Sequence, residues 1–206
     1  MARMTVRHAL AELEREGLVH RRPGTGTYVS EPRIGVTIGS VADELLSAGG
    51  ESTTKLLRVE RSEPTGRVAL ALDLPEGVDV LTTTRLRSVH GEPLAIETSH
   101  WSEALMPGLF ENLTEGSLWA IARNHYGLVP VRVEAQLETI TLDQRTSEQL
   151  GVRVGAAAFV LSRWTYDQRG RCFEFARDLY RGDRTAFRMH QMVPGSGAGG
   201  ILIVTE

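Results

Sequence analysis

Apolar residues recur at helical spacing near the start of the chain. The i, i+3, i+4, i+7 pattern predicts a helix that begins at Arg3 and that Gly17 ends, because glycine enters the left-handed region without a Cβ penalty. The apolar stripe of this helix consists of Val6, Ala9, Leu10 and Leu13. A helix this short is marginal in water unless its apolar face is packed.

Two short β-prone runs, residues 18–20 and 27–29, follow this helix and predict a hairpin that turns at residues 23–26. The polar end of the helix and the neck of the hairpin carry arginine and threonine, which bind phosphates and guanine edges. Any amphipathic helix before a hairpin has this periodicity, so the pattern alone leaves DNA binding open. The candidate DNA-binding residues are Arg3, Thr5, Arg7, Arg21, Arg22, Gly24 and Gly26.

The rest of the pattern predicts strands joined mostly by turns. Residues 30–35 are expected to be a linker, and residues 194–200 part of a flexible tail. Strands are predicted at 56–61, 80–89, 94–101, 129–137, 159–166, 172–180 and 186–193, and helices at 40–48, 68–74, 117–126 and 146–150. Hairpin-linked strands with few intervening helices indicate an α+β fold, an antiparallel sheet with helices on one face.

Composition and charge exclude several classes of protein. The net charge of −3 over 206 residues is not that of a nucleic-acid polyelectrolyte, although six arginines lie within the first 33 residues. No apolar run approaches the roughly 20 residues of a membrane helix, and no secretory signal is seen. The lone Cys172 suits a reducing cytoplasm. The scattered histidines lack metal-site spacing, so neither a metal nor a cofactor is expected.

The order of residues at the start of the chain carries a family resemblance. Arg3-x-Thr5-Val6-Arg7-x-Ala9-Leu10, Glu16-Gly17-Leu18 and Arg22-x-Gly24-x-Gly26-Thr27-x-Val29 resemble the recognition helix and wing of GntR-type bacterial transcription regulators. The resemblance implies operator DNA as a partner. Such domains carry further helices before this point, so we expect that the chain starts too far downstream and that residues 1–206 alone bind DNA weakly.

A second, independent resemblance runs from about Gly39 to Phe187. Arg85-Leu86-Arg87, Gly91-Glu92-Pro93-Leu94-Ala95-Ile96-Glu97, Gly116-Ser117-Leu118-Trp119 and Tyr180-Arg181-Gly182-Asp183-Arg184 resemble the UTRA effector domain, the ligand sensor of the HutC-like branch of GntR regulators. The resemblance implies a fold similar to chorismate lyase. The expected domains are a partial winged helix-turn-helix at 1–32, a UTRA domain at 33–193 and a C-terminal tail at 194–206.

The residues of the candidate ligand site leave two interpretations open. Arg85 and Arg87 are two apart on a strand, so their side chains leave the same face, where they repel unless an anion or a carboxylate lies between them. If the turn centres on Gly91, Glu97 lies directly opposite Arg85, which also fits a cross-strand ion pair without any ligand. Ser117 opens a helix, where it serves as a plain N-cap or helps to attract an anion.

The family resemblance assigns these residues to one effector pocket. It implies that arginines and a helix N-terminus hold a phosphate or carboxylate, while glutamates accept hydrogen bonds from hydroxyl groups. Trp119 replaces a tyrosine that is common there and so lacks a phenolic hydroxyl, and a core role for it stays open. The candidate effector-binding residues are Arg85, Arg87, Glu97, Ser117, Trp119, Glu174 and Tyr180.

Together these features predict a cytoplasmic, ligand-responsive transcription regulator. It is expected to be a repressor that binds a small anionic metabolite and acts as a homodimer, since two-fold operators need two-fold proteins and the strand at 129–142 leaves an exposed edge. One alternative is an effector-binding module without DNA binding. Another is a chorismate-lyase-like enzyme, but fold similarity does not carry activity and the sequence offers no obvious nucleophile with a partner.

Overall fold

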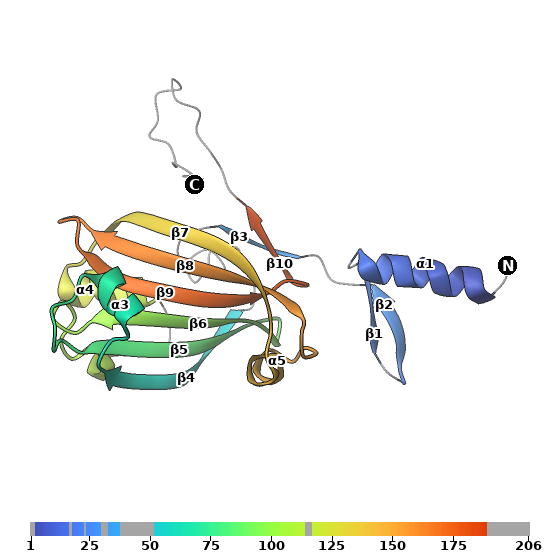
Figure 1. The fold of residues 1–206 in the computed structure, drawn as a ribbon, viewed down its shortest axis with the longest axis horizontal. Coiled ribbons are helices and arrows are strands. Elements are labelled where there is room, and N and C mark those ends of the chain that lie inside the picture. The colour runs from blue at the N-terminus through green and yellow to red at the C-terminus, as the bar shows by residue number, and fades with distance from the viewer. Residues whose placement is uncertain are drawn as a thin grey trace, which may run out of the picture.

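The computed structural model describes residues 3–16, 18–22, 24–29, 33–37, 52–113 and 117–188 (Figure 1). The helices are α1 (Arg3–Arg15), α3 (Gly66–Leu72), α4 (Leu118–Tyr126) and α5 (Gln144–Leu150), with a 3-10 helix η1 (Leu109–Asn112). The strands are β1 (Val19–Arg22), β2 (Gly26–Val29), β3 (Ile34–Thr37), β4 (Ser52–Ser62), β5 (Val80–Val89), β6 (Glu92–Ser102), β7 (Pro130–Thr141), β8 (Ala157–Asp167), β9 (Cys172–Arg181) and β10 (Thr185–Arg188).

A six-stranded antiparallel sheet in the order β4-β5-β6-β9-β8-β7 forms the centre of the larger unit. The β5–β6 hairpin turns at His90 and Gly91, which both have positive φ angles (50° and 77°). This turn sets the register that pairs Arg85 with Glu97, as the sequence predicts. The α+β prediction is confirmed.

Helices cover both faces of this sheet, so the expectation that they lie on one face is wrong. Leu81 packs with residues of α4 and η1, whereas its neighbour Val80 packs with α3. Adjacent residues of a strand point to opposite faces, so α4 and α3 lie on opposite sides. Figure 1 shows α3 and α5 in front of the sheet. We call the side with α4 the inner face, and the side with α3 and α5 the outer face.

A short parallel pair of strands, β3 and β10, covers the other end of the inner face. Val36 of β3 and Phe187 of β10 pack with Tyr180 of β9 and Leu161 of β8. Strand β3 therefore begins at Ile34, inside the linker predicted at residues 30–35, because its apolar side chains gain burial by covering the sheet. The predicted helix at 40–48, the C′ position of Gly17 and the tail at 194–206 lie outside the described residues.

Local sequence signals place both ends of α4 and the end of α5 at Gly151 as predicted, whereas α3 and α5 each begin two residues earlier than predicted and α3 ends two residues earlier. The Ser117 side chain accepts a hydrogen bond from the backbone N–H of Ala120 at the start of α4, and Gly127 ends this helix in the left-handed region. Asp143 caps α5 in the same way, with 2.8 Å between its Oδ1 and the backbone N of Thr146. These caps hold α4 and α5 at defined positions on opposite faces of the sheet.

The first described residues form a separate small unit of α1 and the hairpin β1–β2 (Figure 1). Within the described chain no residue of α1 is buried, and Met4 and Val6 are 60% and 46% exposed. The helix and hairpin predictions are confirmed, and Gly24 and Gly26 supply the positive φ angles of the turn. No described helix is long and apolar enough to span a membrane.

Gly182 offers a test of the packing between β9 and the start of β8. A Cβ at this position would lie 2.8 Å from the carbonyl oxygen of Ala157, so we expect Gly182→Ala to lower the free energy of unfolding by about 1–3 kcal/mol. Gly66→Ala is the matched control, because no heavy atom lies within 4 Å of that Cβ and alanine favours the helix. Urea denaturation measures both, and equal stabilities would contradict this close approach.

Candidate functional site

Glu97 is the shared counter-ion of two arginines on the inner face. Its carboxylate accepts hydrogen bonds from Arg87 Nε at 2.6 Å and Arg87 Nη2 at 3.0 Å, and lies 3.1 Å from Arg85 Nη2. The side chains of Arg87 and Glu97 are only 2% and 5% exposed, and that of Arg85 is 14% exposed. Sequence pairing predicts Arg85 opposite Glu97, but the bidentate partner is Arg87, which reaches diagonally across the strands.

The ionisation of this group follows from its geometry. Burial alone raises the pKa of Glu97, but the hydrogen bonds from Arg87 and the charge of Arg85 outweigh burial and hold the pKa below its ordinary value. Burial lowers the pKa of Arg87, and its bond to Glu97 raises the pKa above the ordinary value. Glu97 and Arg87 are therefore both charged near neutral pH, and two guanidiniums share the Glu97 carboxylate.

Glu174 is the second buried carboxylate of the inner face, and neutral donors surround it. Its Oε1 accepts from Ser99 Oγ at 2.9 Å, and its Oε2 accepts from Trp119 Nε1 at 2.6 Å and Thr165 Oγ1 at 2.9 Å. Trp119 of α4 is thereby fixed to β9, so its ring joins the polar cluster and also packs against the apolar core.

Sequence reasoning missed two buried charged residues of the same face. Arg163 Nη2 donates to Asp178 Oδ2 at 2.8 Å, and the guanidinium carbon of Arg163 lies 6.0 Å from the centre of the Trp119 ring. Burial, together with the charges of Glu97 and Glu174, raises the pKa of Asp178 to about 7, although Arg163 opposes this rise. Period-2 alternation from Glu174 through Asp178 to Tyr180 is the signal that places Asp178 on this face.

The structure thus brings six of the seven sequence-predicted effector residues into one cluster on the inner face. Burial raises the pKa of Tyr180 well above its ordinary value, as do the charges of Asp178 and Glu97. Ser117 is placed differently, as the N-cap of α4, two residues before Trp119 and in contact with the Ala120 backbone. The cluster members are Arg85, Arg87, Glu97, Trp119, Glu174 and Tyr180, joined by Arg163, Asp178, Ser99 and Thr165.

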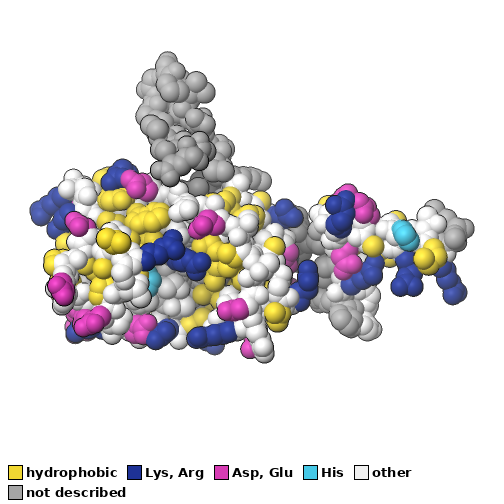
Figure 2. Space-filling model, in the orientation of Figure 1, with side chains coloured by type: hydrophobic (Ala, Val, Ile, Leu, Met, Phe, Trp, Pro, Cys, Tyr) yellow, Lys and Arg dark blue, Asp and Glu magenta, His cyan; other side chains and the backbone are white. Residues whose placement is uncertain are grey.

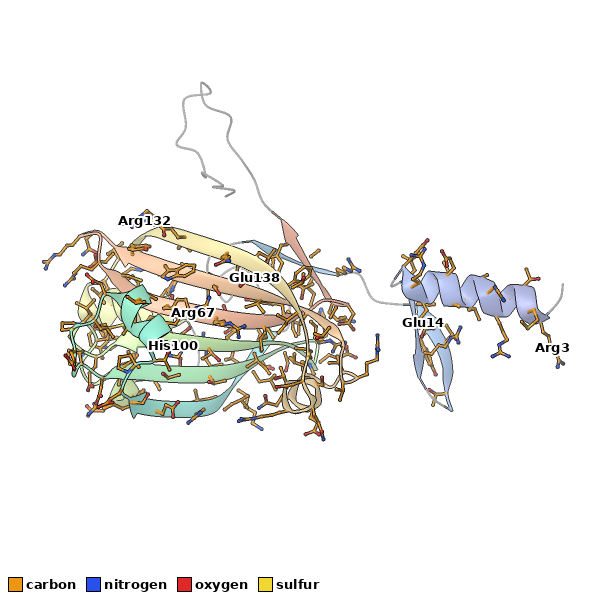
Figure 3. All side chains as sticks on the ribbon, viewed as in Figure 1. Arg3, Glu14, Arg67, His100, Arg132 and Glu138 are labelled. Atoms are coloured by element: carbon orange, nitrogen blue, oxygen red, sulfur yellow. The ribbon has the colours of Figure 1, made fainter. Side chains whose placement is uncertain are left out.

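The predicted DNA-binding side chains lie on the α1–hairpin unit. Arg3, Thr5 and Arg7 are exposed, and Figure 2 shows basic side chains along the side of α1 from which the hairpin extends. In Figure 3, Arg3 lies at the end of α1 farthest from the sheet, and Glu14 lies near the hairpin. Arg21 Nε lies 3.2 Å from Glu14 Oε2, which ties the hairpin to the helix. The side chain of Arg22 lies outside the described residues.

The chemistry of the remaining reactive side chains differs from that of this cluster. Burial raises the pKa of Cys172 to about 12, so its thiol carries almost no thiolate near neutral pH. His100 lies on the outer face near Arg67 of α3, and burial lowers its pKa (Figure 3). No group of three metal-ligating side chains occurs among the residues that the structure describes.

Comparisons with known proteins match both units. The UTRA domain profile matches residues 47–186, and the profile of bacterial regulatory proteins of the gntR family matches residues 1–29. The chain belongs to the GntR family and carries a UTRA domain. This GntR regulator lies in the HutC-like branch, as its sequence motifs predict.

Relatives of this GntR regulator are named as repressors. The HTH-type transcriptional repressor NagR of Bacillus subtilis is 32% identical over 197 residues, which span 93% of this chain and 80% of that protein. The repressor PhnF of Mycolicibacterium smegmatis is 36% identical over 191 residues, or 91% and 77% of the two chains. The crystal structure of PhnF from Mycobacterium smegmatis superposes with a TM-score of 0.73 and 32% identity, covering 92% of this chain and 86% of that one.

The two matched units define the general function. A UTRA domain joined to the gntR-type DNA-binding element makes this GntR regulator a ligand-responsive, DNA-binding transcription regulator. Its relatives are named as transcriptional repressors. The effector, the assembly and the roles of individual residues are considered as proposals below.

Replacing Glu97 by alanine tests whether its carboxylate holds the inner face together. The change leaves the buried Arg87 and the partly buried Arg85 side by side without their shared counter-ion, so we expect the free energy of unfolding to fall by about 3–5 kcal/mol. Glu134→Ala is the control, because Glu134 forms an exposed ion pair with Arg132 and its loss should change stability little. Chemical denaturation measures both variants, and equal small effects would contradict a structural role for Glu97.

Proposed function

We propose that this GntR regulator is a homodimeric repressor in the cytoplasm, and that a small anionic metabolite bound to the cluster on the inner face releases it from operator DNA. The observation that carries the proposal is the sharing of one buried carboxylate, Glu97, by the buried Arg87 and the partly buried Arg85. A single negative charge between two guanidiniums leaves one positive charge that is not balanced locally. A phosphate or carboxylate matches that charge and the planar N–H groups of arginine.

The neighbouring carboxylate suggests what else the effector carries. Glu174 holds three neutral donors on its two oxygens, and a carboxylate has about four lone-pair sites. One further acceptor site therefore remains for a hydroxyl group of the effector. The proposed ligand has an anionic group near Arg85 and Arg87 and a hydroxyl group near Glu174.

The fold supplies a route from the site to the DNA-binding unit. Tyr180, in the cluster, packs in the same apolar group as Val36 of β3, and its ring meets that of Phe187 of β10 edge-on with centroids 5.4 Å apart. In the sequence, β3 starts at Ile34, only a few residues after β2 ends at Val29. A shift of Tyr180 on effector binding would therefore move the β3–β10 pair and with it the attachment of the wing.

The homodimer is supported by the open edges of the sheet. Strands β4 and β7 are the outermost strands of the six-stranded sheet, and β7 is 12 residues long with Val131 62% exposed. Long exposed strand edges invite pairing with another chain. Regulators that read two-fold operators are themselves two-fold, so a second copy of this chain is the proposed partner.

DNA binding through α1 is tested by Arg7→Ala. We expect this change to weaken operator binding by about 1–3 kcal/mol, because Arg7 is proposed to contact a base edge. Glu16→Ala is the control, since Glu16 lies at the opposite end of the helix and is acidic. Fluorescence anisotropy on a fragment selected from random DNA measures both at several salt concentrations. Equal affinities of the two variants would contradict the proposed contact.

The anionic effector is tested by thermal-shift screening with phosphorylated and carboxylated metabolites, each beside its neutral counterpart. An anionic effector at 100 times its Kd should stabilise the protein by about 2.7 kcal/mol. Arg87→Ala should abolish this gain, measured against its own ligand-free state, whereas Arg132→Ala on the β7 edge should retain it. Neutral counterparts that stabilise as strongly as the anions would contradict the proposal.

A further inference from the structure

Asp178 lies within the buried cluster, and only one of its two carboxylate oxygens has a hydrogen-bond partner. The residue is fully buried, and its Oδ2 accepts the bond from Arg163. Among the described residues, Asp178 Oδ1 has no hydrogen-bond partner, and neither has the hydroxyl of Tyr180 two residues away. Buried polar atoms without partners are rare in folded proteins and point to an unfilled role.

The charges that face Asp178 come from every strand of the cluster that carries one. Strand β5 contributes Arg87, and its Arg85 lies against Glu97; β6 contributes Glu97 itself, and β8 contributes Arg163. Strand β9 adds the Glu174 carboxylate and the uncharged, titratable hydroxyl of Tyr180. Of the side chains that the structure describes, those of α4, β3, β7 and β10 that pack against the cluster are uncharged: Trp119, Ile34, Val36, Leu137 and Phe187.

The net charge of the cluster depends on whether Asp178 carries a proton. Three arginines and three carboxylates cancel when Asp178 is ionised, and the cluster carries one net positive charge when Asp178 is neutral. An anion that enters a buried group of zero net charge adds an unbalanced charge in a region of low dielectric constant, which is unfavourable. An anion that enters the neutral-Asp178 cluster meets a compensating charge.

We infer that Asp178 takes up a proton from solvent when an anionic effector binds, so that effector binding is proton-coupled. The inference rests on the proposed anionic effector and adds how the same site is regulated. The only bond change is a proton transfer: a water molecule or buffer acid gives up one proton, and an O–H bond forms at Asp178 Oδ1, because Oδ2 is held by Arg163. Protonation turns Oδ1 from a hydrogen-bond acceptor into an O–H donor. A bound anion can then accept a hydrogen bond from this O–H group.

The environment of Asp178 favours this step near neutral pH. Burial and the nearby Glu97 and Glu174 carboxylates raise its pKa to about 7 before any ligand arrives. The negative charge of a bound anion raises that pKa further. The proton-bound form is therefore the form that holds the anion, and affinity decreases as pH rises through the pKa of the free protein.

Inorganic sulfate is the probe, because its charge stays constant across the range of pH that is tested. Calorimetry on the whole chain at pH 6 and pH 8 should show sulfate affinity falling about tenfold as pH rises, as expected for uptake of one proton. Repeating the pH 8 titration in two buffers of different ionisation enthalpy counts the protons taken up per sulfate bound. This count uses the unaltered protein and so does not depend on whether any variant folds.

Two variants separate the outcomes. Asp178→Asn keeps the shape and the acceptor toward Arg163, and should bind sulfate with the same affinity at both pH values and with no proton uptake. The proton coupling would be overturned if Asp178→Asn took up as many protons as the unaltered protein. It would also be overturned if the sulfate affinity of the unaltered protein did not change with pH. Either result would leave the proposed anion site unaffected. Two other results would overturn both the anion site and the proton coupling. One is sulfate binding to Arg87→Ala with the same affinity as to the unaltered protein, and the other is no sulfate binding to the unaltered protein.

Discussion

The ion pairs of Glu97 with Arg85 and Arg87 are the constraint on which the inner face of the sheet depends. Guanidiniums as deeply buried as Arg87 are tolerated only when a carboxylate lies against them, because the desolvation cost of an unpaired buried charge is several kcal/mol. The β5–β6 turn at His90 and Gly91 provides that carboxylate by fixing the strand register. A single hairpin turn thereby determines whether a polar cluster can exist inside an otherwise apolar layer.

The apolar parts of the same face isolate this cluster and connect it to the rest of the molecule. Helix α4 closes one side, where Trp119 bonds Glu174 and packs on the core, and the β3–β10 pair closes the other. Low dielectric between these walls strengthens every charge interaction within. Strand β3 follows the β1–β2 hairpin closely in the sequence. A change in the charge of the buried cluster that shifts β3 would therefore also shift the hairpin of the proposed DNA-binding unit.

Local sequence patterns predicted most of the helices and strands. The features that they missed depend on contacts between residues that are distant in sequence. Turn residues and period-2 alternation were enough to pair Arg85 with Glu97 across one hairpin. The Arg163–Asp178 pair depends on the register of β8 and β9. The sequence predicts the turn between these strands at residues 167–170, but the buried charges along both strands were missed. The parallel strand at Ile34–Thr37 pairs with residues about 150 positions later, and no local signal reports such a contact.

The distribution of helices shows the same limit. Element lengths and caps are local properties, so α4 and α5 begin and end near the predicted residues. The face that each helix covers is a property of the whole chain path, because it depends on which way each connection crosses the sheet. The residues proposed to bind DNA or effector follow from the family resemblance and from geometry, and measurements of binding decide their roles.

The sulfate affinity of Glu97→Gln tests most directly whether the shared carboxylate and an anionic ligand compete for the same guanidinium N–H groups. Glutamine keeps the shape of the side chain and one acceptor oxygen but removes the negative charge that Arg85 and Arg87 share. The account predicts that sulfate binds this variant more tightly than it binds the unaltered protein. An affinity that is unchanged or weaker in Glu97→Gln would contradict an anion site at these two arginines.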